Sequence, residues 1–201
     1  MRSPARNLVL ASSNPGKLRE LGAMLEPLGW NVLPQSEWNV PEAVEDGLSF
    51  IENALIKARH ASGLTGLPAL GDDSGLVVDC LDGAPGIFSS RYAGVGSSDS
   101  DNIRKLLEAL AGVAAVERTA HFYCAMVFVR HQRDPAPLLA TGQWDGRILE
   151  EPRGGGGFGY DPVFWVPDEA CSSAELPPDV KNRISHRGRA LAALAGQLSG
   201  L

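Results

Sequence analysis

Two adjacent carboxylates, Asp72 and Asp73, stand inside the stretch GDDSGLVVDC, with hydrophobic residues on both sides of them. The pattern places the pair where one strand ends and another begins. Carboxylate oxygens in such a position suit Mg²⁺, which prefers oxygen ligands, and one carboxylate can instead take a proton from water. Glu45 and Asp46, ahead of a predicted helix, offer further oxygens. A second interpretation is that the pair caps a turn completed by the serine and glycine that follow.

A polar segment near the start of the chain, SSNPGK, lies between a strand-like run and a helix-like run. Lys17 stands at the entrance of the predicted helix, where free N–H groups and the positive end of the helix dipole favour anions. Lysine adds a point charge with three donors. The segment therefore predicts a phosphate site, while ordinary N-capping by Ser13 or Asn14 with a solvated lysine accounts for the same residues. It is not a Walker P-loop, because the GxxxxGKS or GxxxxGKT spacing is absent.

The glycine run 154–157 leads into two aromatic residues in GGGGFGYDP. Phe158 can stack on a base because every base has a π face, and Tyr160 and Asp161 can reach the edge of the base or the sugar. The other interpretation is a β-turn whose two aromatic side chains, Phe158 and Tyr160, pack in the core.

A local concentration of basic residues lies in KNRISHRGRAL, ahead of the last predicted helix: Lys181, His186, Arg187 and Arg189. Lysine and guanidinium groups are hydrogen-bond donors only. They favour a base with a 6-keto oxygen and oppose a base with a 6-amino group. The alternative interpretation is a solvated basic face in which His186 caps the helix.

Hydrophobic periodicity predicts the elements that must position these residues. Short apolar runs predict strands at 7–11, 31–34, 68–70, 76–81, 119–130 and 138–144. Apolar residues at helical spacing predict helices at 18–28, 49–62, 101–110 and 191–198. On the second of these, Asn53 and Lys57 are four residues apart and share one face. Strands and helices interleave, so the expected class is α/β with a mixed sheet.

Length and composition limit the classes of protein. The 201 residues, 44% of them hydrophobic, suit a single domain spanning 1–201. The net charge of −6 argues against a nucleic-acid-binding face. No apolar run reaches the ~20 residues that cross a bilayer, and the first one is too short for a signal peptide, so we expect a cytoplasmic protein. Three widely spaced cysteines indicate neither a zinc site nor a disulfide framework.

Five segments in this order resemble the inosine triphosphate pyrophosphatase family, which removes non-standard purine nucleotides: SSNPGK, FIENALIKAR, GDDSGLVVDCLDGAPGIFSSRYAG, GGFGYDPVF and SHRGRAL. Each segment is a weak signal, but the ordered set is specific and covers nearly the whole chain. The resemblance implies an elongated mixed β-sheet flanked by helices, with two lobes around a central nucleotide cleft. It implies a homodimer, Mg²⁺, and hydrolysis of ITP, dITP and XTP to the monophosphate and pyrophosphate, which cleanses the nucleotide pool.

The resemblance also implies roles for residues that match the family's motifs. The triphosphate would contact Ser12, Ser13, Asn14, Pro15, Gly16 and Lys17, with added positive charge from Lys57. Asp73 would be metal ligand and general base, with Asp72 beside it and Glu45 as a further metal ligand. Ser74 would touch the substrate, and Phe158, Gly159, Tyr160 and Asp161 would hold base and sugar. Lys181, His186 and Arg187 would read the base.

This chain departs from the family's pattern in small ways. Ser12 stands where the family frequently has threonine, and the hydroxyl group is kept. Gly71 stands where alanine is commoner in the family, and this replacement is expected to be harmless in a tight turn. Val44 stands where a second glutamate can occur, so the metal role is better founded for Asp73 than for Glu45.

In an α/β sheet the ligand crevice opens at strand ends. There, a metal-oriented water would attack the α phosphorus, with Asp73 as base.

Two other functions stay open. A Maf-type pyrophosphatase, acting on pyrimidine or modified nucleotides, would have a similar fold, but the SHR and FGYDP segments argue against it. A non-catalytic nucleotide sensor would have no need of Asp73 as a base. The donor argument explains rejection of ATP but not of GTP, which also carries a 6-keto oxygen.

Overall fold

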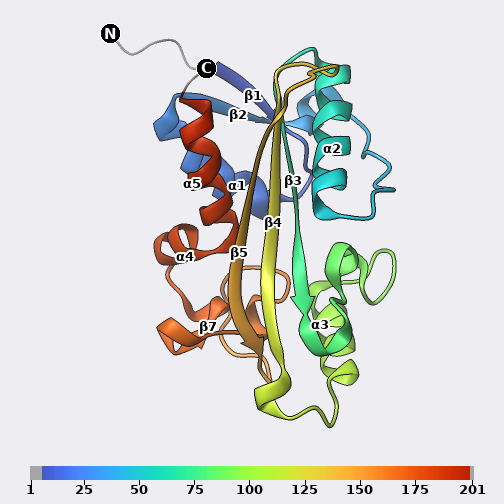
Figure 1. Cartoon of the computed structure of the whole chain (residues 1–201), viewed down its shortest axis with the longest axis vertical. Coiled ribbons are helices and arrows are strands. Elements are labelled where there is room, and N and C mark those ends of the chain that lie inside the picture. Colours follow the sequence, from blue (N-terminus) through green and yellow to red (C-terminus); the bar gives the residue numbers. More distant parts are fainter. Residues whose placement is uncertain (1–5, 200–201) are drawn as a thin grey trace. The chain divides into compact units, whose positions relative to one another are not determined.

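The computed structural model describes residues 6–199, whose strands form one mixed sheet in the order β2-β1-β3-β4-β5-β6-β7 (Figure 1). The strands are β1 Arg6–Leu10, β2 Trp30–Pro34, β3 Ala69–Val78, β4 Thr119–Val129, β5 Leu138–Ile148, β6 Phe164–Val166 and β7 Cys171–Ser172. The helices are α1 Pro15–Leu25, α2 Phe50–Thr65, α3 Asp99–Ala109, α4 Pro178–Ile184 and α5 His186–Leu198. The predicted α/β class with a mixed sheet is confirmed.

Strand direction changes across the sheet. β1 pairs in parallel with both β2 and β3, whereas β6 pairs antiparallel with β5 and with β7. The parallel strands are joined through α1 and α2, as parallel connections require a crossover. Among the described residues, no helix combines the length and hydrophobicity that a bilayer crossing needs.

The chain divides into two compact units. Unit 1 comprises the chain up to Asp73, Cys124–Gly142 and the chain from Arg189 on, and unit 2 comprises Ser74–Tyr123 and Gln143–Gly188. The boundaries between the units fall inside three strands, after Asp73 in β3, before Cys124 in β4 and after Gly142 in β5. Each of these strands therefore contributes residues to both units. The prediction of a single domain stays a prediction.

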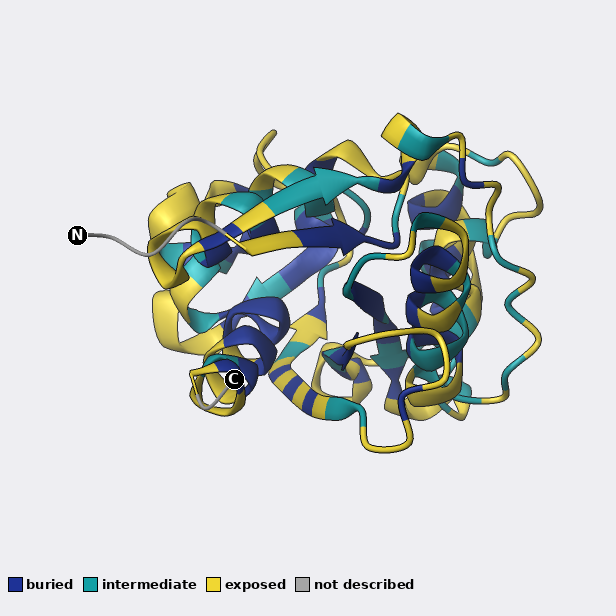
Figure 2. Cartoon of the chain, turned by 90° about the horizontal axis from the view of Figure 1, so that it is seen from above, coloured by how far each residue is buried: buried dark blue, intermediate teal, exposed yellow. Residues whose placement is uncertain are grey.

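Each unit has a hydrophobic core of its own. In unit 1, Leu21 and Leu25 of α1 and Leu194 of α5 pack with Leu8 and Phe128 of the sheet. The helices carry buried and exposed residues on opposite sides, which is the expected pattern for helices that cover a core (Figure 2).

The core of unit 2 combines α3 with aromatic side chains. Leu106 of α3 packs in one cluster with Phe122, Trp144 and Phe164. The ring centroids of Phe122 and Phe164 are 4.5 Å apart. Tyr160 and Val163, from the segment between β5 and β6, belong to the same cluster.

The prediction of two strands around the acidic pair is wrong. The sequence predicts strands at 68–70 and 76–81, whereas β3 is continuous and passes through Asp72 and Asp73. Each carboxylate has a lysine partner within hydrogen-bond distance, so the charges of both aspartates are compensated inside the strand. Gly71, expected in a tight turn, therefore lies inside a strand.

Helix α2 approaches β3 closely at Gly71. The helix begins after the N-cap Ser49 and ends at Thr65, before the C-cap Gly66, which has a φ of 70°. Its face toward the strands is lined by small residues, including Ala54 and Ala58, both fully buried. A Cβ atom on Gly71 would lie 2.0 Å from the carbonyl oxygen of Ala54, so the helix can lie this close only because residue 71 has no side chain.

The Gly71→Ala substitution is expected to lower the free energy of unfolding by about 1–3 kcal/mol, because the new methyl group must push α2 away from β3. Urea denaturation measures the change. Gly22→Ala is the matched control, since a Cβ at Gly22 in α1 meets no atom within 4 Å. Equal unfolding free energies for Gly71→Ala and the unmodified protein would contradict the close contact.

Candidate active site

The start of α1 shows the capping that the sequence allows. Asn14 is the N-cap, and its Oδ1 accepts the N–H groups of Gly16 at 2.8 Å and of Lys17 at 3.2 Å. Pro15 occupies the first turn, where its missing N–H is tolerated. Ser13, Asn14 and Pro15 are exposed, so the end of the helix is accessible to an anion. Phosphate binding here stays a prediction.

The serines that precede α1 take part in local hydrogen bonds. Ser12 Oγ accepts the N–H of Asn14 at 3.2 Å, and Ser13 Oγ accepts a hydrogen bond from Gln35 Nε2 at 3.1 Å. Gln35 is itself buried. It had no role in the sequence analysis, because a glutamine after an apolar run carries no motif.

Lys17 meets the first carboxylate of the pair. Its Nζ donates to Asp72 Oδ1 at 2.7 Å and to the backbone carbonyl of Asp72 at 3.1 Å. The Asp72 side chain has no exposed surface, and its other oxygen accepts from Cys124 Sγ at 3.7 Å. Asp72 thus neutralises the lysine predicted to bind phosphate, and its predicted metal role stays untested.

Asp73 faces a different helix. Successive side chains in a strand point to opposite faces, and Asp73 Oδ1 accepts from Lys57 Nζ of α2 at 2.6 Å. Glu45 Oε2 lies 3.3 Å from the same Nζ. The side chains of Lys57 and Asp73 are 13% and 11% exposed, so the pair is largely shielded from water. Two carboxylates therefore share one ammonium group.

Burial and charge act together on the group formed by Glu45, Lys57 and Asp73. Asp73 Oδ2 is buried and has no hydrogen-bond partner. Burial raises the pKa of the Asp73 carboxyl, and the Lys57 ammonium is the main group opposing that shift. Burial alone would lower the pKa of Lys57, but the carboxylates of Asp73 and Glu45 raise it above its ordinary value. The lysine is thus held protonated, and the role of Asp73 as a general base stays a prediction.

The same oxygens fit a magnesium ion. Mg²⁺ is usually held by one or two carboxylates together with substrate phosphates rather than by an all-protein cage. Glu45 and the unpartnered Asp73 Oδ2 offer such a donor set. Within residues 6–199, no three His, Cys, Asp or Glu side chains gather as a complete metal site. A divalent cation here would depend on ligands from a phosphate.

A second group of predicted residues lies in unit 2 and centres on Asp161. This carboxylate is 2% exposed. Its Oδ2 accepts the N–H of Phe158 at 2.8 Å and Lys181 Nζ at 2.6 Å. Its Oδ1 accepts Ser173 Oγ at 2.8 Å. Asp161 thus fixes the aromatic loop and a lysine, and Ser173 is a partner that the sequence analysis missed.

Tyr160 packs in the core of unit 2, as the alternative interpretation proposed. The residue is 4% exposed, and its hydroxyl donates to the backbone carbonyl of Ser89 at 2.9 Å. Burial raises the pKa of the Tyr160 hydroxyl well above its ordinary value. Gly159, beside it, has a φ of 62° and donates its N–H to Asp99 at 2.7 Å. Substrate contact by either residue stays a prediction.

Two of the basic residues, Lys181 and Arg187, lie against Phe158 rather than on a solvated face, whereas Arg189 is exposed. Lys181 Nζ lies 5.0 Å and Arg187 Cζ 5.6 Å from the centre of the Phe158 ring. Arg187 is 3% exposed and donates to Ser74 Oγ at 3.0 Å. His186 stacks on Phe122, with ring centroids 4.8 Å apart. The structure therefore brings Ser74, Phe158, Lys181 and Arg187 together within unit 2.

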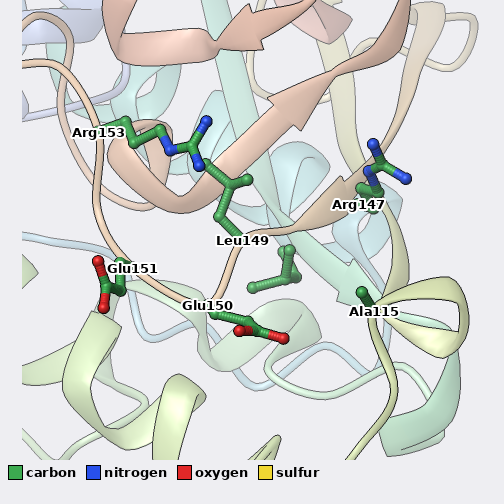
Figure 3. A pocket seen from close by; sticks show the side chains of 7 residues that line it. Ala115, Arg147, Leu149, Glu150, Glu151 and Arg153 are labelled. Carbon is green, nitrogen blue, oxygen red and sulfur yellow. The ribbon is translucent and has the colours of Figure 1, made fainter.

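A hollow elsewhere in unit 2 is not part of either group. It has a volume of about 370 Å³ and is lined by charged residues of both signs, among them Arg147, Arg153, Glu150 and Glu151 (Figure 3). All four of these residues are exposed. None of the predicted site residues lines it, so its size alone does not make it the candidate site.

Lys57→Met is expected to raise the pKa of Asp73 further, because the variant loses the cation that favours the ionised carboxylate. An aspartate whose pKa is raised by folding costs stability as the pH rises above its ordinary value of 3.8. The variant should therefore lose more unfolding free energy than the unmodified protein between pH 4 and 8. Carboxyl ¹³C NMR titration of the metal-free protein measures the pKa. Lys105→Met, which removes an exposed lysine of α3, should leave the pKa of Asp73 unchanged.

Asp161→Asn is expected to lower the unfolding free energy by about 3 kcal/mol, because it removes the carboxylate that neutralises the buried Lys181. The double variant Asp161→Asn/Lys181→Met should recover part of this loss, since the lysine charge is then absent. Urea denaturation of the two single variants and the double variant measures the coupling. Additive losses would show that the ion pair does not hold this loop.

Comparison with known proteins relates the whole chain to one family. The model of the Ham1 family matches residues 8–197. The dITP/XTP pyrophosphatase of Methylococcus capsulatus is 58% identical over 196 residues, which are 98% of each chain. That of Vibrio parahaemolyticus is 56% identical over 194 residues, which are 96% of this chain and 97% of the relative.

Solved structures agree with this assignment. The HAM1 protein from Coxiella burnetii superposes with a TM-score of 0.90 at 49% identity, covering 98% of this chain and 100% of that one. The Staphylococcus aureus Ham1 protein has a TM-score of 0.85 at 36% identity, with coverages of 97% and 99%. Sequence and fold thus match along nearly the whole length, and the chain belongs to the Ham1 family.

Proposed function

We propose that this protein hydrolyses non-standard purine nucleoside triphosphates (ITP, dITP and XTP) to the nucleoside monophosphate and pyrophosphate, and so cleanses the nucleotide pool. The observation that carries the proposal is the group of Glu45, Lys57 and Asp73, in which a buried carboxylate oxygen has no partner. The names of the relatives, dITP/XTP pyrophosphatase, support the substrate class.

In this proposal the lysines of unit 1 bind the triphosphate. Lys17 and Lys57 are held by carboxylates within 3.3 Å, and phosphate oxygens would compete for the same ammonium groups. Residues 12–16 lie at the start of α1, where the hydroxyl groups of Ser12 and Ser13 would donate to the phosphates. Positive charge placed in advance stabilises the negative charge that develops on the leaving pyrophosphate.

Asp73 acts as the general base. A water oxygen attacks the α phosphorus, the bond from that phosphorus to the bridging oxygen breaks, and pyrophosphate leaves. The proton of the attacking water passes to the Asp73 carboxylate, whose pKa burial raises above its ordinary value. Glu45 and Asp73 would hold Mg²⁺, which supplies charge neutralisation and orientation when bound. Asp72 serves mainly by fixing Lys17.

Base recognition belongs to the residues of unit 2. Phe158, flanked by two cations, offers a ring for stacking. Lys181, Arg187 and His186 present N–H donors, which suit a 6-keto oxygen and leave a 6-amino group unpaired. Ser74 contacts the substrate beside Arg187. Asp161 and Tyr160 act from inside the protein by positioning this loop.

Further features follow from the resemblance to the family. We propose a homodimer that works in the cytoplasm on free nucleotides. The net charge of −6 is consistent with a small-molecule substrate rather than a nucleic acid.

The test is pyrophosphate release from ITP, dITP, XTP, GTP, ATP and dTTP, with Mg²⁺ and with chelator. Rapid, metal-dependent release from ITP and XTP, with little from ATP and GTP, is the expected result. Release confined to dTTP would support a Maf-type enzyme. Nucleotide binding without any release would support a sensor and contradict the role of Asp73.

Asp73→Asn is expected to lower kcat for ITP by a factor of about 10² to 10⁴, while nucleotide binding is largely kept, because the amide cannot accept the proton. Steady-state kinetics and equilibrium binding of ITP in chelator separate the two effects. Asp168→Asn, which changes an exposed aspartate after β6, is the matched control and should leave kcat unchanged. Near-normal turnover of Asp73→Asn would remove it as the base.

A further inference from the structure

Asn53 of α2 has no part in the chemistry proposed above, yet its side chain is fully buried beside the residues that carry it. Its Oδ1 accepts the N–H of Gly47 at 3.0 Å. Its Nδ2 is buried and has no hydrogen-bond partner. An unsatisfied buried donor costs about 1–3 kcal/mol, so stability alone does not account for an asparagine at this position.

The contact with Gly47 fixes the segment that carries Glu45. Glu45 lies two residues before Gly47, and the residues after Gly47 are also attached to α2. Leu48 donates its N–H to Glu52 Oε2 at 2.9 Å, and Ser49 caps the helix. The segment that carries Glu45 is therefore attached to α2 at Gly47 and Leu48.

The fit between Gly47 and Asn53 is close. A Cβ atom on Gly47 would lie 2.7 Å from Asn53 Oδ1 and equally close to the Cβ of Glu52. Asn53 and Lys57 lie four residues apart on one helix face. One face of α2 therefore holds both the segment of Glu45 and the lysine that Glu45 contacts at 3.3 Å.

The side chain of Asn53 is neutral, and this accounts for its unpaired Nδ2 donor. Two carboxylates, Glu45 and Asp73, already share the ammonium group of Lys57. An aspartate at position 53 would accept the Gly47 hydrogen bond but add a third negative charge in the interior. An amide accepts the bond without charge, and the unpaired Nδ2 is the consequence.

We propose that Asn53 is a positioning residue for the divalent cation. Its side-chain oxygen holds Gly47, and through it Glu45, so that the Glu45 carboxylate stays beside Lys57 and Asp73, where it helps to bind the metal. The proposal rests on the proposed function, because it takes Glu45 and Asp73 as the metal ligands. Residues that orient metal ligands typically change metal affinity by a factor of 10 to 100 when they are replaced.

The test measures metal binding separately from turnover. Mn²⁺ serves as the probe ion, titrated into the protein with a non-hydrolysable α,β-methylene analogue of ITP and followed by electron paramagnetic resonance. Asn53→Leu removes the acceptor at similar volume and should weaken Mn²⁺ binding about tenfold. Binding of the analogue in chelator should be unchanged, and excess Mg²⁺ should restore the kcat for ITP.

Two further variants separate positioning from folding. Asn53→Asp keeps the acceptor, so it should bind Mn²⁺ at least as tightly as the unmodified protein even though its added buried charge lowers the unfolding free energy. Gly47→Ala pushes the segment away from Asn53 and should weaken Mn²⁺ binding as Asn53→Leu does, so the proposal stays testable if Asn53→Leu does not fold.

Asn102→Leu is the matched control. Asn102 of α3 is also a buried asparagine, 3% exposed, and its Oδ1 accepts a loop N–H, that of Ala93, at 2.7 Å. It lies in unit 2, so its loss should lower stability and leave Mn²⁺ affinity unchanged.

Unchanged Mn²⁺ affinity in both Asn53→Leu and Gly47→Ala would overturn the proposal, even where the unmodified protein shows metal-dependent pyrophosphate release. Equal weakening in Asn102→Leu would also overturn it, because the effect would then be general loosening. Absence of pyrophosphate release from the unmodified protein would instead contradict the proposed function, while weakened Mn²⁺ binding in the two variants would still support the positioning role.

Discussion

Two buried ion pairs, Lys17–Asp72 and Lys57–Asp73, determine how unit 1 is built around its polar interior. Adjacent residues of β3 point to opposite faces, so each aspartate needs a cation from a different helix. Removing one partner of a buried pair generally costs about 3–5 kcal/mol, because an uncompensated charge remains. The positions of α1 and α2 on the strands are therefore tied to the acidic pair as well as to the hydrophobic core.

The same arrangement supports the proposed binding of a triphosphate in unit 1. Both ammonium groups are held in place by carboxylates, and in the proposed function phosphate oxygens compete for them. The surroundings are largely shielded from water, which strengthens electrostatic interactions. The two aspartates differ in what remains available, because Asp72 is bonded through both oxygens whereas Asp73 keeps one buried oxygen without a partner. This difference fits the proposal in which Asp72 fixes Lys17 and Asp73 acts as the base.

In each unit, a buried side-chain oxygen accepts a backbone N–H and so fixes a segment that carries predicted site residues. In unit 2, Asp161 accepts a backbone N–H at Phe158 and carries a charge that Lys181 neutralises. In unit 1, Asn53 accepts a backbone N–H at Gly47 but is neutral. The choice follows from the local charge, because Lys57 is already shared by two carboxylates. Each loop is thereby attached to a helix or turn of its own unit rather than left to solvent.

The sequence alone determined the α/β class, the approximate bounds of α2, α3, β4 and β5, and the family, because hydrophobic periodicity and ordered motifs are local properties of the chain. It also indicated that Asn53 and Lys57 share a helix face. Only the tertiary structure decided that β3 runs through the acidic pair, that Asp72 and Asp73 meet different lysines, and that Asp161 and Tyr160 point inward. These outcomes depend on partners such as Lys17, 55 residues from Asp72, and burial of a charge is decided by such distant partners, which no local pattern reveals.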